Sequence, residues 1–175
     1  MSIKQFNGSY YPIEDRLQIR FNTPNDEEFK LWLTRRLALH LLHFCEQFAL
    51  KQLSTKHSPA IVKDIDQFEQ LALKQKADFS TAYTPSQTLP LGELPILVTG
   101  ITLKGIDTTE NSPVNLSFQL ENQMNLGLTI SREMLNSIRL LLEELVAGAG
   151  WNTNSIESSS EEQPPTVPVN PATLH

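Results

Sequence analysis

Residues 29–53 carry the clearest pattern of hydrophobic and polar positions in the chain. Phe29, Leu31 and Leu33 occupy every second position, and this period of two predicts a strand with one buried face. From position 34 onward the apolar residues recur every three or four positions, which predicts a helix. The buried positions of this helix are Leu37, Leu41, Phe44 and Phe48. Thr34 separates the two patterns and suits an N-cap, because its hydroxyl can accept a hydrogen bond from a free helical N–H group.

A hairpin precedes this helix. Residues 16–21 alternate between apolar and polar side chains, and the turn formers at 22–28 join them to the strand that begins at Phe29. A further short strand is expected within residues 2–11, where Asn7-Gly8 marks its end. The first part of the chain therefore predicts three strands followed by a helix.

The second part of the chain repeats this order. Strand patterns occur at 96–104, 114–118 and 126–130, and Ser131 then suits the N-cap of a helix that ends near Gly148. A shift of 97 positions aligns the two parts without a gap. It places Leu17, Phe21, Leu31, Thr34, Arg35 and Leu41 on Val114, Phe118, Leu128, Ser131, Arg132 and Ile138. Patterning by burial alone is the alternative, but it does not require equal turn lengths and coincident N-caps.

We therefore expect a single α+β domain over residues 1–151. Its two pseudo-repeated βββα-like halves, about 1–53 and 94–148, form an antiparallel sheet with the helices on one face. An insertion at 54–93 separates the halves. The tail at 152–175 is rich in serine, glutamate and proline and is expected to be disordered.

The insertion predicts one helix over residues 59–77, with Pro59 at its first position. Its single apolar stripe consists of Ile61, Ile65, Phe68 and Ala72. We expect this stripe to shield a face of the two repeat helices. Residues 78–95 are expected to form a surface connector.

Two features of the C-terminal region lead to separate expectations. Residues 165–171 contain three prolines and are compatible with an extended polyproline segment that a partner reads, although a solvated tail without a role is the simpler reading. Cutting the chain after Gly150 is expected to leave the fold intact, with Trp151 as the residue there that can pack back on the core.

Composition and charge restrict the class of partner. The formal net charge of -6 argues against broad binding to a phosphate backbone, which needs a concentrated basic surface. The single cysteine excludes a disulfide framework within the chain, and the N-terminal residues lack the apolar core of a signal peptide. We expect a cytoplasmic protein without a membrane-spanning segment.

Trp32 is the first candidate contact residue. It alternates out of phase with Leu31 and Leu33, so its side chain is expected on the other face of the sheet, near the cations of the hairpin. These cations are Arg16, Arg20 and Lys30. A tryptophan beside arginines is typical of an interaction hot spot. The alternative is that another part of the same chain covers it.

Arg35 and Arg36 lie in the first turn of the first predicted helix, where the free N–H groups favour an anion. No glycine-rich loop precedes this turn, so the backbone cradle of a nucleotide-binding loop is missing. Ion pairs with Glu14, Glu27 or Glu28 are the simpler use of these arginines.

The chain has no recognisable catalytic or metal-binding motif. His40 and His43 have a spacing that can supply two metal ligands, but no further ligand pattern accompanies them. Cys45 lies inside a helix and lacks the position at a helix start that lowers a thiol pKa. We therefore expect no catalytic residue, no metal and no cofactor.

Both repeat helices carry apolar residues on a second face. These residues include Leu39, Leu42, Leu140 and Val146. One sheet cannot cover so wide an arc, and the inserted helix can shield only one such face. This pattern predicts self-association, most simply as a homodimer.

These observations favour a non-enzymatic adaptor or assembly subunit that binds a protein partner through the sheet face and the helix surfaces. The alternative from another class is a module that binds nucleic acid or an anionic ligand through the Arg/Trp patch. Its residues are Arg16, Arg20, Lys30, Trp32, Arg35 and Arg36. The acidic net charge makes the protein partner the first expectation.

Overall fold

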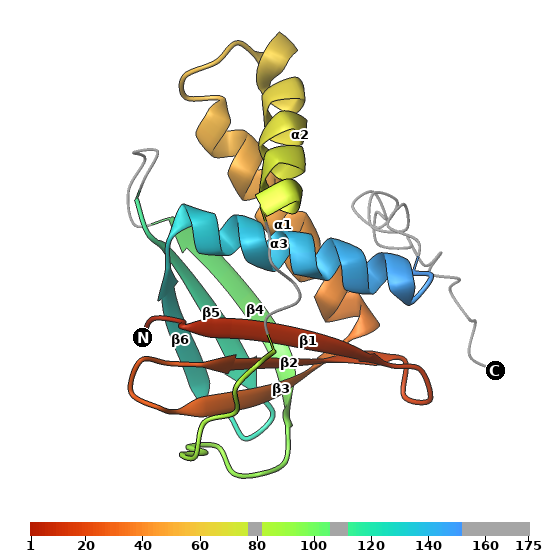
Figure 1. The fold of residues 1–175 in the computed structure, drawn as a ribbon, viewed down its shortest axis with the longest axis vertical. Helices are drawn as coiled ribbons and strands as arrows, with labels where there is room; N and C mark the ends of the chain where they lie inside the picture. Colours follow the sequence, from red (N-terminus) through yellow and green to blue (C-terminus); the bar gives the residue numbers. More distant parts are fainter. Residues whose placement is uncertain (77–81, 106–111, 152–175) are drawn as a thin grey trace, which may run out of the picture.

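The fold is α+β, as predicted, with a six-stranded mixed sheet and three helices in the described part of the chain. The computed structural model describes residues 1–76, 82–105 and 112–151. The first half comprises β1 (Gln5–Tyr11), β2 (Arg16–Asn22), β3 (Glu28–Thr34) and α1 (Arg35–Leu53), followed by α2 (Pro59–Lys76). The second half comprises β4 (Ile96–Gly105), β5 (Val114–Leu120), β6 (Asn125–Ile130) and α3 (Arg132–Gly148). Figure 1 shows α2 standing away from the sheet at one end of the molecule.

The sheet consists of two antiparallel three-stranded meanders, and its strand order follows the chain from β1 to β6. The meanders join through a short parallel pairing of β3 with β4, at Leu31 with Ile96 and Trp32 with Leu97. The prediction of an entirely antiparallel sheet was therefore wrong. The reason is that α1, α2 and the connector lie between these strands and return the chain to the end from which β3 started, as a parallel crossover requires.

The two outer edges of the sheet are not equivalent. The backbone N–H of Thr129 in β6 donates to the carbonyl of Met1 at 2.8 Å, and the Met1 amino group donates to the carbonyl of Gly127 at 3.3 Å. The residues before β1 therefore lie against the last strand, as Figure 1 shows at the N-terminus. This contact covers part of an edge that would otherwise be open to pairing with another chain.

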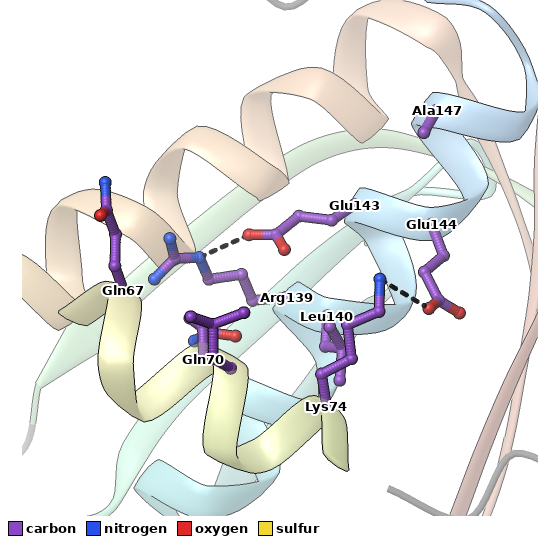
Figure 2. A pocket seen from close by; sticks show the side chains of 9 residues that line it. Gln67, Gln70, Lys74, Arg139, Leu140, Glu143, Glu144 and Ala147 are labelled. Atoms are coloured by element: carbon purple, nitrogen blue, oxygen red, sulfur yellow. Dashed lines mark hydrogen bonds and ion pairs between the residues drawn. The ribbon is translucent and has the colours of Figure 1, made fainter.

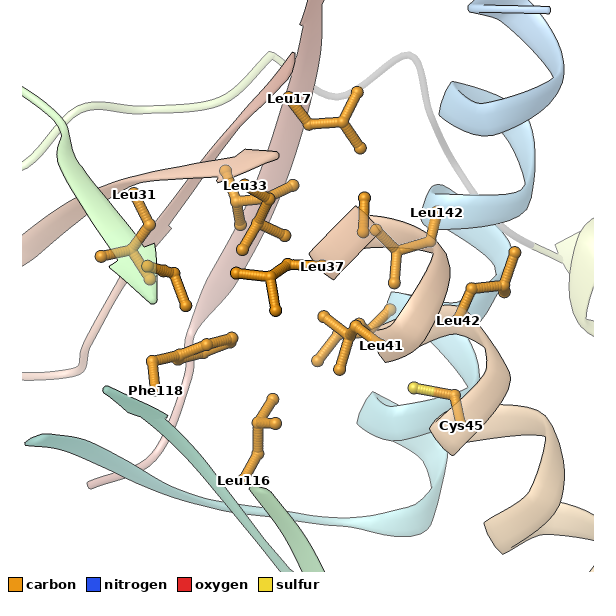
Figure 3. Packing of buried hydrophobic residues seen from close by; sticks show 14 of the residues in the cluster. Leu17, Leu31, Leu33, Leu37, Leu41, Leu42, Cys45, Leu116, Phe118 and Leu142 are labelled. Carbon is orange, nitrogen blue, oxygen red and sulfur yellow. The ribbon is translucent and has the colours of Figure 1, made fainter. Parts of the chain in front are cut away.

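One hydrophobic core joins both meanders to α1 and α3. The alternating positions predicted from the sequence point into it: Leu17, Ile19, Phe21, Leu31, Leu33, Val114, Leu116, Phe118, Leu128 and Ile130 are almost completely buried. Figure 3 shows Leu37 and Leu41 of α1 and Leu142 of α3 meeting strand residues such as Leu33 and Phe118. Burial of each such side chain contributes about 1.5–3 kcal/mol.

Positions that correspond in the two halves lie in corresponding elements. Leu17 in β2 and Val114 in β5 are both fully buried. Thr34 and Ser131 are the N-caps of α1 and α3, and their side chains accept hydrogen bonds from the backbone N–H groups of Leu37 and Met134. Superposition of the two halves as a repeat stays a prediction.

The inserted helix α2 turns Ile61 and Phe68 of its predicted stripe outward, whereas Ile65 and Ala72 are half-buried, so the expectation that the whole stripe shields other helices was wrong. Ile61 is 45% exposed and Phe68 is 73% exposed, whereas Val62 and Asp66 are buried. The physical reason is that α2 faces α3 largely through ion pairs. These pairs are Asp66 with Arg139, Glu69 with Arg132 and Lys74 with Glu144.

Leu39, Leu42, Leu140 and Val146 are all buried within one chain. The argument that these second faces would need a partner molecule was therefore wrong. Packing of α1 and α3 against each other, with α2 beside both, covers the wide apolar arc that the sheet alone cannot cover.

β1 continues through Asn7-Gly8, where the sequence predicted its end, because both residues pair with β2, opposite Arg20 and Ile19. Gly8 also allows α3 to approach the strand closely. A Cβ atom at this position would lie 2.5 Å from Leu145 Cδ1 and 3.1 Å from Ile19 Cδ1. We expect Gly8→Ala to lower the free energy of unfolding by about 1–3 kcal/mol, the usual cost of overpacking. Chemical denaturation measures this change.

The matched control is the same substitution at Gly148, near the end of α3. A Cβ atom there meets nothing within 4 Å, so Gly148→Ala is expected to stabilise the protein by about 0.4–1 kcal/mol through the unfolded chain. Equal effects of the two substitutions would contradict the close approach of α3 to β1.

Candidate interaction surfaces

The outer face of the first meander carries an aromatic and cationic cluster around Trp32. The Trp32 and Tyr11 rings meet edge to face with centroids 4.8 Å apart, and the guanidinium carbon of Arg16 lies 4.2 Å from the Trp32 centroid. Gln18 pairs with Trp32 across β2 and β3 and accepts a hydrogen bond from the Tyr11 hydroxyl at 3.3 Å. We call these four residues the Trp32 cluster.

Half-burial of Trp32 results from neighbours in the same chain, but it leaves part of the cluster in contact with solvent. Tyr11 is 39% exposed and Trp32 is intermediate. Arg16 also forms an ion pair with Glu14. The sequence indicated Trp32 and Arg16 as neighbours but missed Tyr11, because the end of β1 was not assigned to the same face.

Arg20 and Lys30 lie on the same outer face and are directly opposite each other on β2 and β3. The Arg20 guanidinium donates to Asn7 Oδ1 at 2.9 Å and lies 4.8 Å from the ring centroid of Tyr83. Lys30 Nζ donates to the carbonyl of Glu93 at 3.4 Å. Residues of the connector therefore bind this end of the face, and burial raises the pKa of Tyr83 to about 12.

Arg35 and Arg36 do not join this face. Arg35 lies 4.0 Å from Asp15 and 5.8 Å from the Trp151 ring centroid, at the start of α1. Arg36 is exposed in the same turn. The expected ion pair exists for Arg35, but its partner is Asp15. The six predicted contact residues thus divide between two regions of the molecule.

Trp151 connects the end of α3 to the turn between β1 and β2. Its indole N–H donates to Asp15 Oδ1 at 2.7 Å, and its ring meets Tyr10 edge to face at 5.5 Å. The Tyr10 hydroxyl donates to the same oxygen of Asp15 at 3.0 Å. Trp151 is buried, so the described chain ends in a core contact.

A cleft of about 600 Å³ lies between α2 and α3. Figure 2 shows Gln67, Gln70 and Lys74 of α2 facing Arg139, Glu143 and Glu144 of α3 across it. The cleft is lined by Gln67, Gln70, Leu71, Lys74, Arg139, Leu140, Glu143, Glu144 and Ala147.

Arg139 is the central charge beside this cleft and is almost fully buried. Its Nη1 donates to both carboxylate oxygens of Asp66 at 2.8 and 3.0 Å, and its Nε donates to Glu143 at 2.9 Å. Burial raises the pKa of Glu46 in α1, and the nearby positive charge of Arg139 opposes that rise. The same environment raises the pKa of Cys45 to about 12 through burial, which makes its thiol a poor nucleophile.

His40 packs against Phe44 with ring centroids 4.4 Å apart. Among the residues that the structure describes, no group of three or more His, Cys, Asp or Glu side chains is placed to hold a metal ion.

The exposed apolar side of α2 is the second candidate surface. Ile61, Phe68 and Leu71 are 45%, 73% and 61% exposed, and we call them the α2 stripe. Leu71 also lines the cleft with α3, so the stripe and the cleft are continuous. The sequence identified an apolar face of this helix but not its outward direction.

Within the described ranges, no helix has the length and apolar character to cross a bilayer. Comparison with models of protein families, with curated proteins and with solved structures found no match.

Proposed function

We propose that this protein is a non-enzymatic, cytoplasmic adaptor or assembly subunit that binds a protein partner mainly through the α2 stripe. The observation that carries this proposal is the exposure of Phe68 and Leu71 on a helix that stands away from the sheet. Contiguous apolar side chains on a protein surface mark interaction sites. The sheet face around Trp32 is a second surface of the same proposed function.

The ion pairs between α2 and α3 support this assignment. They fix the rotation of α2, because Asp66 must face Arg139 at 2.8 Å. Rotation that buried Phe68 instead would expose Asp66 and leave Arg139 without its bidentate partner, at a cost of several kcal/mol. The chain therefore keeps the α2 stripe exposed, although burying each large apolar side chain would contribute about 1.5–3 kcal/mol.

Phe68→Glu is expected to abolish partner capture from a lysate of the source organism while leaving the fold unchanged. Phe68 is mostly exposed, so its loss removes little from the core. A central aromatic contact in an interface is worth about 2 kcal/mol or more, which corresponds to roughly a thirtyfold loss of affinity. Affinity capture followed by mass spectrometry measures the change.

The control for charge is Asn25→Glu, which adds the same charge at an exposed position in the turn between β2 and β3. Partners that bind the native chain and Asn25→Glu but not Phe68→Glu identify the α2 stripe as the interface. Equal capture by all three chains would contradict the proposal.

Self-association is the form of this proposal in which a second copy supplies the partner surface. Two α2 stripes meeting about a two-fold axis bury the same residues on both copies, as an isologous interface requires. Light scattering then gives a mass near twice 19.8 kDa for the native chain and the single-chain mass for Phe68→Glu. A native mass of one chain that stays constant on about tenfold concentration excludes the homodimer.

Binding of single-stranded nucleic acid or another anionic ligand is the second candidate function. The observation in its favour is the stacking of Arg16 on Trp32 beside the exposed Tyr11, since bases stack on such aromatic platforms. Against it, Arg16, Arg20 and Lys30 already bind groups of their own chain. Salt-sensitive anisotropy changes with labelled single-stranded DNA or RNA would favour this candidate, and salt-insensitive protein capture would favour the adaptor.

We also propose that the two βββα halves form a structural repeat. Matched burial of Leu17 and Val114 and matched N-caps at Thr34 and Ser131 support it. Superposing residues 16–52 on 113–147 tests the repeat, and unrelated positions for these four residues would exclude it.

A further inference from the structure

A groove of about 430 Å³ lies between the second half of α1 and the middle of β4. On the helix its wall consists of Phe44, Gln47, Phe48 and Lys51, and the spacing of three and four positions places all of them on one face of α1. The strand wall is Ile101-Thr102-Leu103. None of these residues belongs to the Trp32 cluster, to the α2 stripe or to the cleft between α2 and α3, so the groove is a separate site.

The walls of this groove are largely apolar and partly open to solvent. Phe44 and Phe48, which the helical pattern predicted to be buried, are only half-buried, and so are Ile101 and Leu103. Phe48, Ile101 and Leu103 also pack against the hydrophobic core, and this packing holds both walls in place. The volume of about 430 Å³ lies within the range of about 300–1,000 Å³ that is usual for small-molecule sites. The groove therefore suits an apolar chain.

A single cation lies at one end of the groove. Among the described residues that line it, Lys51 carries the only charge. Lys51 is about 10 Å from Phe44 along the helix axis, two turns further on. It is exposed, and within the described ranges its ammonium group has no ion-pair or hydrogen-bond partner. Arg139 beside the other cleft is instead held by Asp66 and Glu143.

An unpaired cation at the end of an apolar surface is complementary to an acidic head group on an apolar chain. The single ammonium group of Lys51 matches the single charge of a carboxylate. A phosphate group carries up to about two negative charges and more acceptor oxygens, and no second cation lines the described part of the groove. The chemistry therefore favours a monocarboxylic acid over a phosphorylated ligand.

We propose that this groove binds a free monocarboxylic acid with a medium-length alkyl chain. The alkyl chain lies between the two phenylalanines of α1 and the side chains of Ile101 and Leu103, and the carboxylate accepts a hydrogen bond from Lys51 Nζ. This site goes beyond the adaptor function and does not depend on it. Residues 152–175, including the predicted polyproline segment, lie outside the described residues and have no part in the site.

The test is an NMR titration of the full chain, labelled at its isoleucine and leucine methyl groups, with octanoate and with 1-octanol. Both probes are kept below the concentration at which octanoate forms micelles. Octanoate is expected to shift the Ile101 and Leu103 methyl signals saturably and to leave those of Ile61 and Leu71 in the α2 stripe unchanged. It is expected to bind about threefold to fivefold more tightly than 1-octanol, the factor that an exposed ion pair provides.

Lys51→Gln is expected to remove this difference. Its affinity for octanoate should fall about threefold to fivefold, while its affinity for 1-octanol stays the same. Lys51 is exposed, so the substitution leaves the core intact. The matched control is Lys63→Gln, which removes the same charge at an exposed position on α2. This control should bind both probes as the native chain does.

Three outcomes would overturn the proposal. Absence of saturable shifts at Ile101 and Leu103, or shifts confined to the α2 stripe, would exclude the groove as the site. Equal affinity of the native chain for octanoate and 1-octanol would exclude a carboxylate as the recognised head group. Equal effects of Lys51→Gln and Lys63→Gln would assign the preference to net charge. The adaptor proposal is judged separately through Phe68→Glu, because Phe68 does not line the groove.

Discussion

Trp151→Ala in the full chain is expected to lower the free energy of unfolding by about 3–5 kcal/mol, the usual cost of truncating a buried aromatic residue. The substitution removes a ring packed against Tyr10 and the indole donor bound to Asp15 at 2.7 Å. Asp15 and the start of α1 then lose their link to the end of α3. Urea denaturation followed by circular dichroism measures the loss.

Two further chains separate the packing from the hydrogen bond and from the tail. Trp151→Phe keeps most of the packing but removes the donor to Asp15, so its cost is expected near the 1–3 kcal/mol of an unmade hydrogen bond. A chain that ends at Trp151 keeps the core contact and should lose less stability than Trp151→Ala. The expectation that cutting after Gly150 is harmless is thereby revised, and the boundary lies one residue later. Unchanged stability of Trp151→Ala would contradict this account.

Arg139→Leu is expected to destabilise the protein by about 3–5 kcal/mol, because it leaves the buried Asp66 without its cation. Glu46 also loses the positive charge that opposes the rise of its pKa, so its pKa is expected to increase further. A raised carboxyl pKa means that the folded state binds a proton more readily than the unfolded state. The variant should therefore lose stability as pH rises through the folded pKa of Glu46.

The double variant Arg139→Leu with Asp66→Leu provides the control. Replacing both members of a buried ion pair by apolar residues is often neutral or stabilising, so most of the lost free energy is expected to return. Denaturation of the four chains at several pH values measures the coupling between the two side chains. An additive double variant would show that the pair is not the source of the loss.

Alternation and capping residues were sufficient to predict most of the sheet and the two repeat helices. Leu17, Phe21 and Leu31 face the core as their period of two required, and Thr34 and Ser131 cap the helices as expected. These features are predictable because they depend on neighbours within a few positions. Likewise Trp32 lies out of the core, beside Arg16 and opposite Gln18.

The errors involve contacts between residues distant in the sequence. An apolar stripe on α2 shows which residues share a face, but the pairing of Asp66 with Arg139, 73 positions away, decides which face turns inward. Trp151 meets Asp15 across 136 positions. In the candidate surface, Arg35 separates from Arg16 because Asp15 and Trp151 hold it at the start of α1. No local period contains this information.

The short parallel pairing of β3 with β4 has a consequence for synthesis on the ribosome. Leu31 and Trp32 of β3 cannot pair with Ile96 and Leu97 of β4 until those two residues have been synthesised. Until then β3 has only one neighbouring strand. At about 5–20 residues per second, that interval lasts several seconds. During this time the nascent first meander presents β3 as an open edge, which is the kind of edge that pairs with other chains. The growing polypeptide is therefore most vulnerable to aggregation before its second meander emerges, and chaperone protection matters most in that interval.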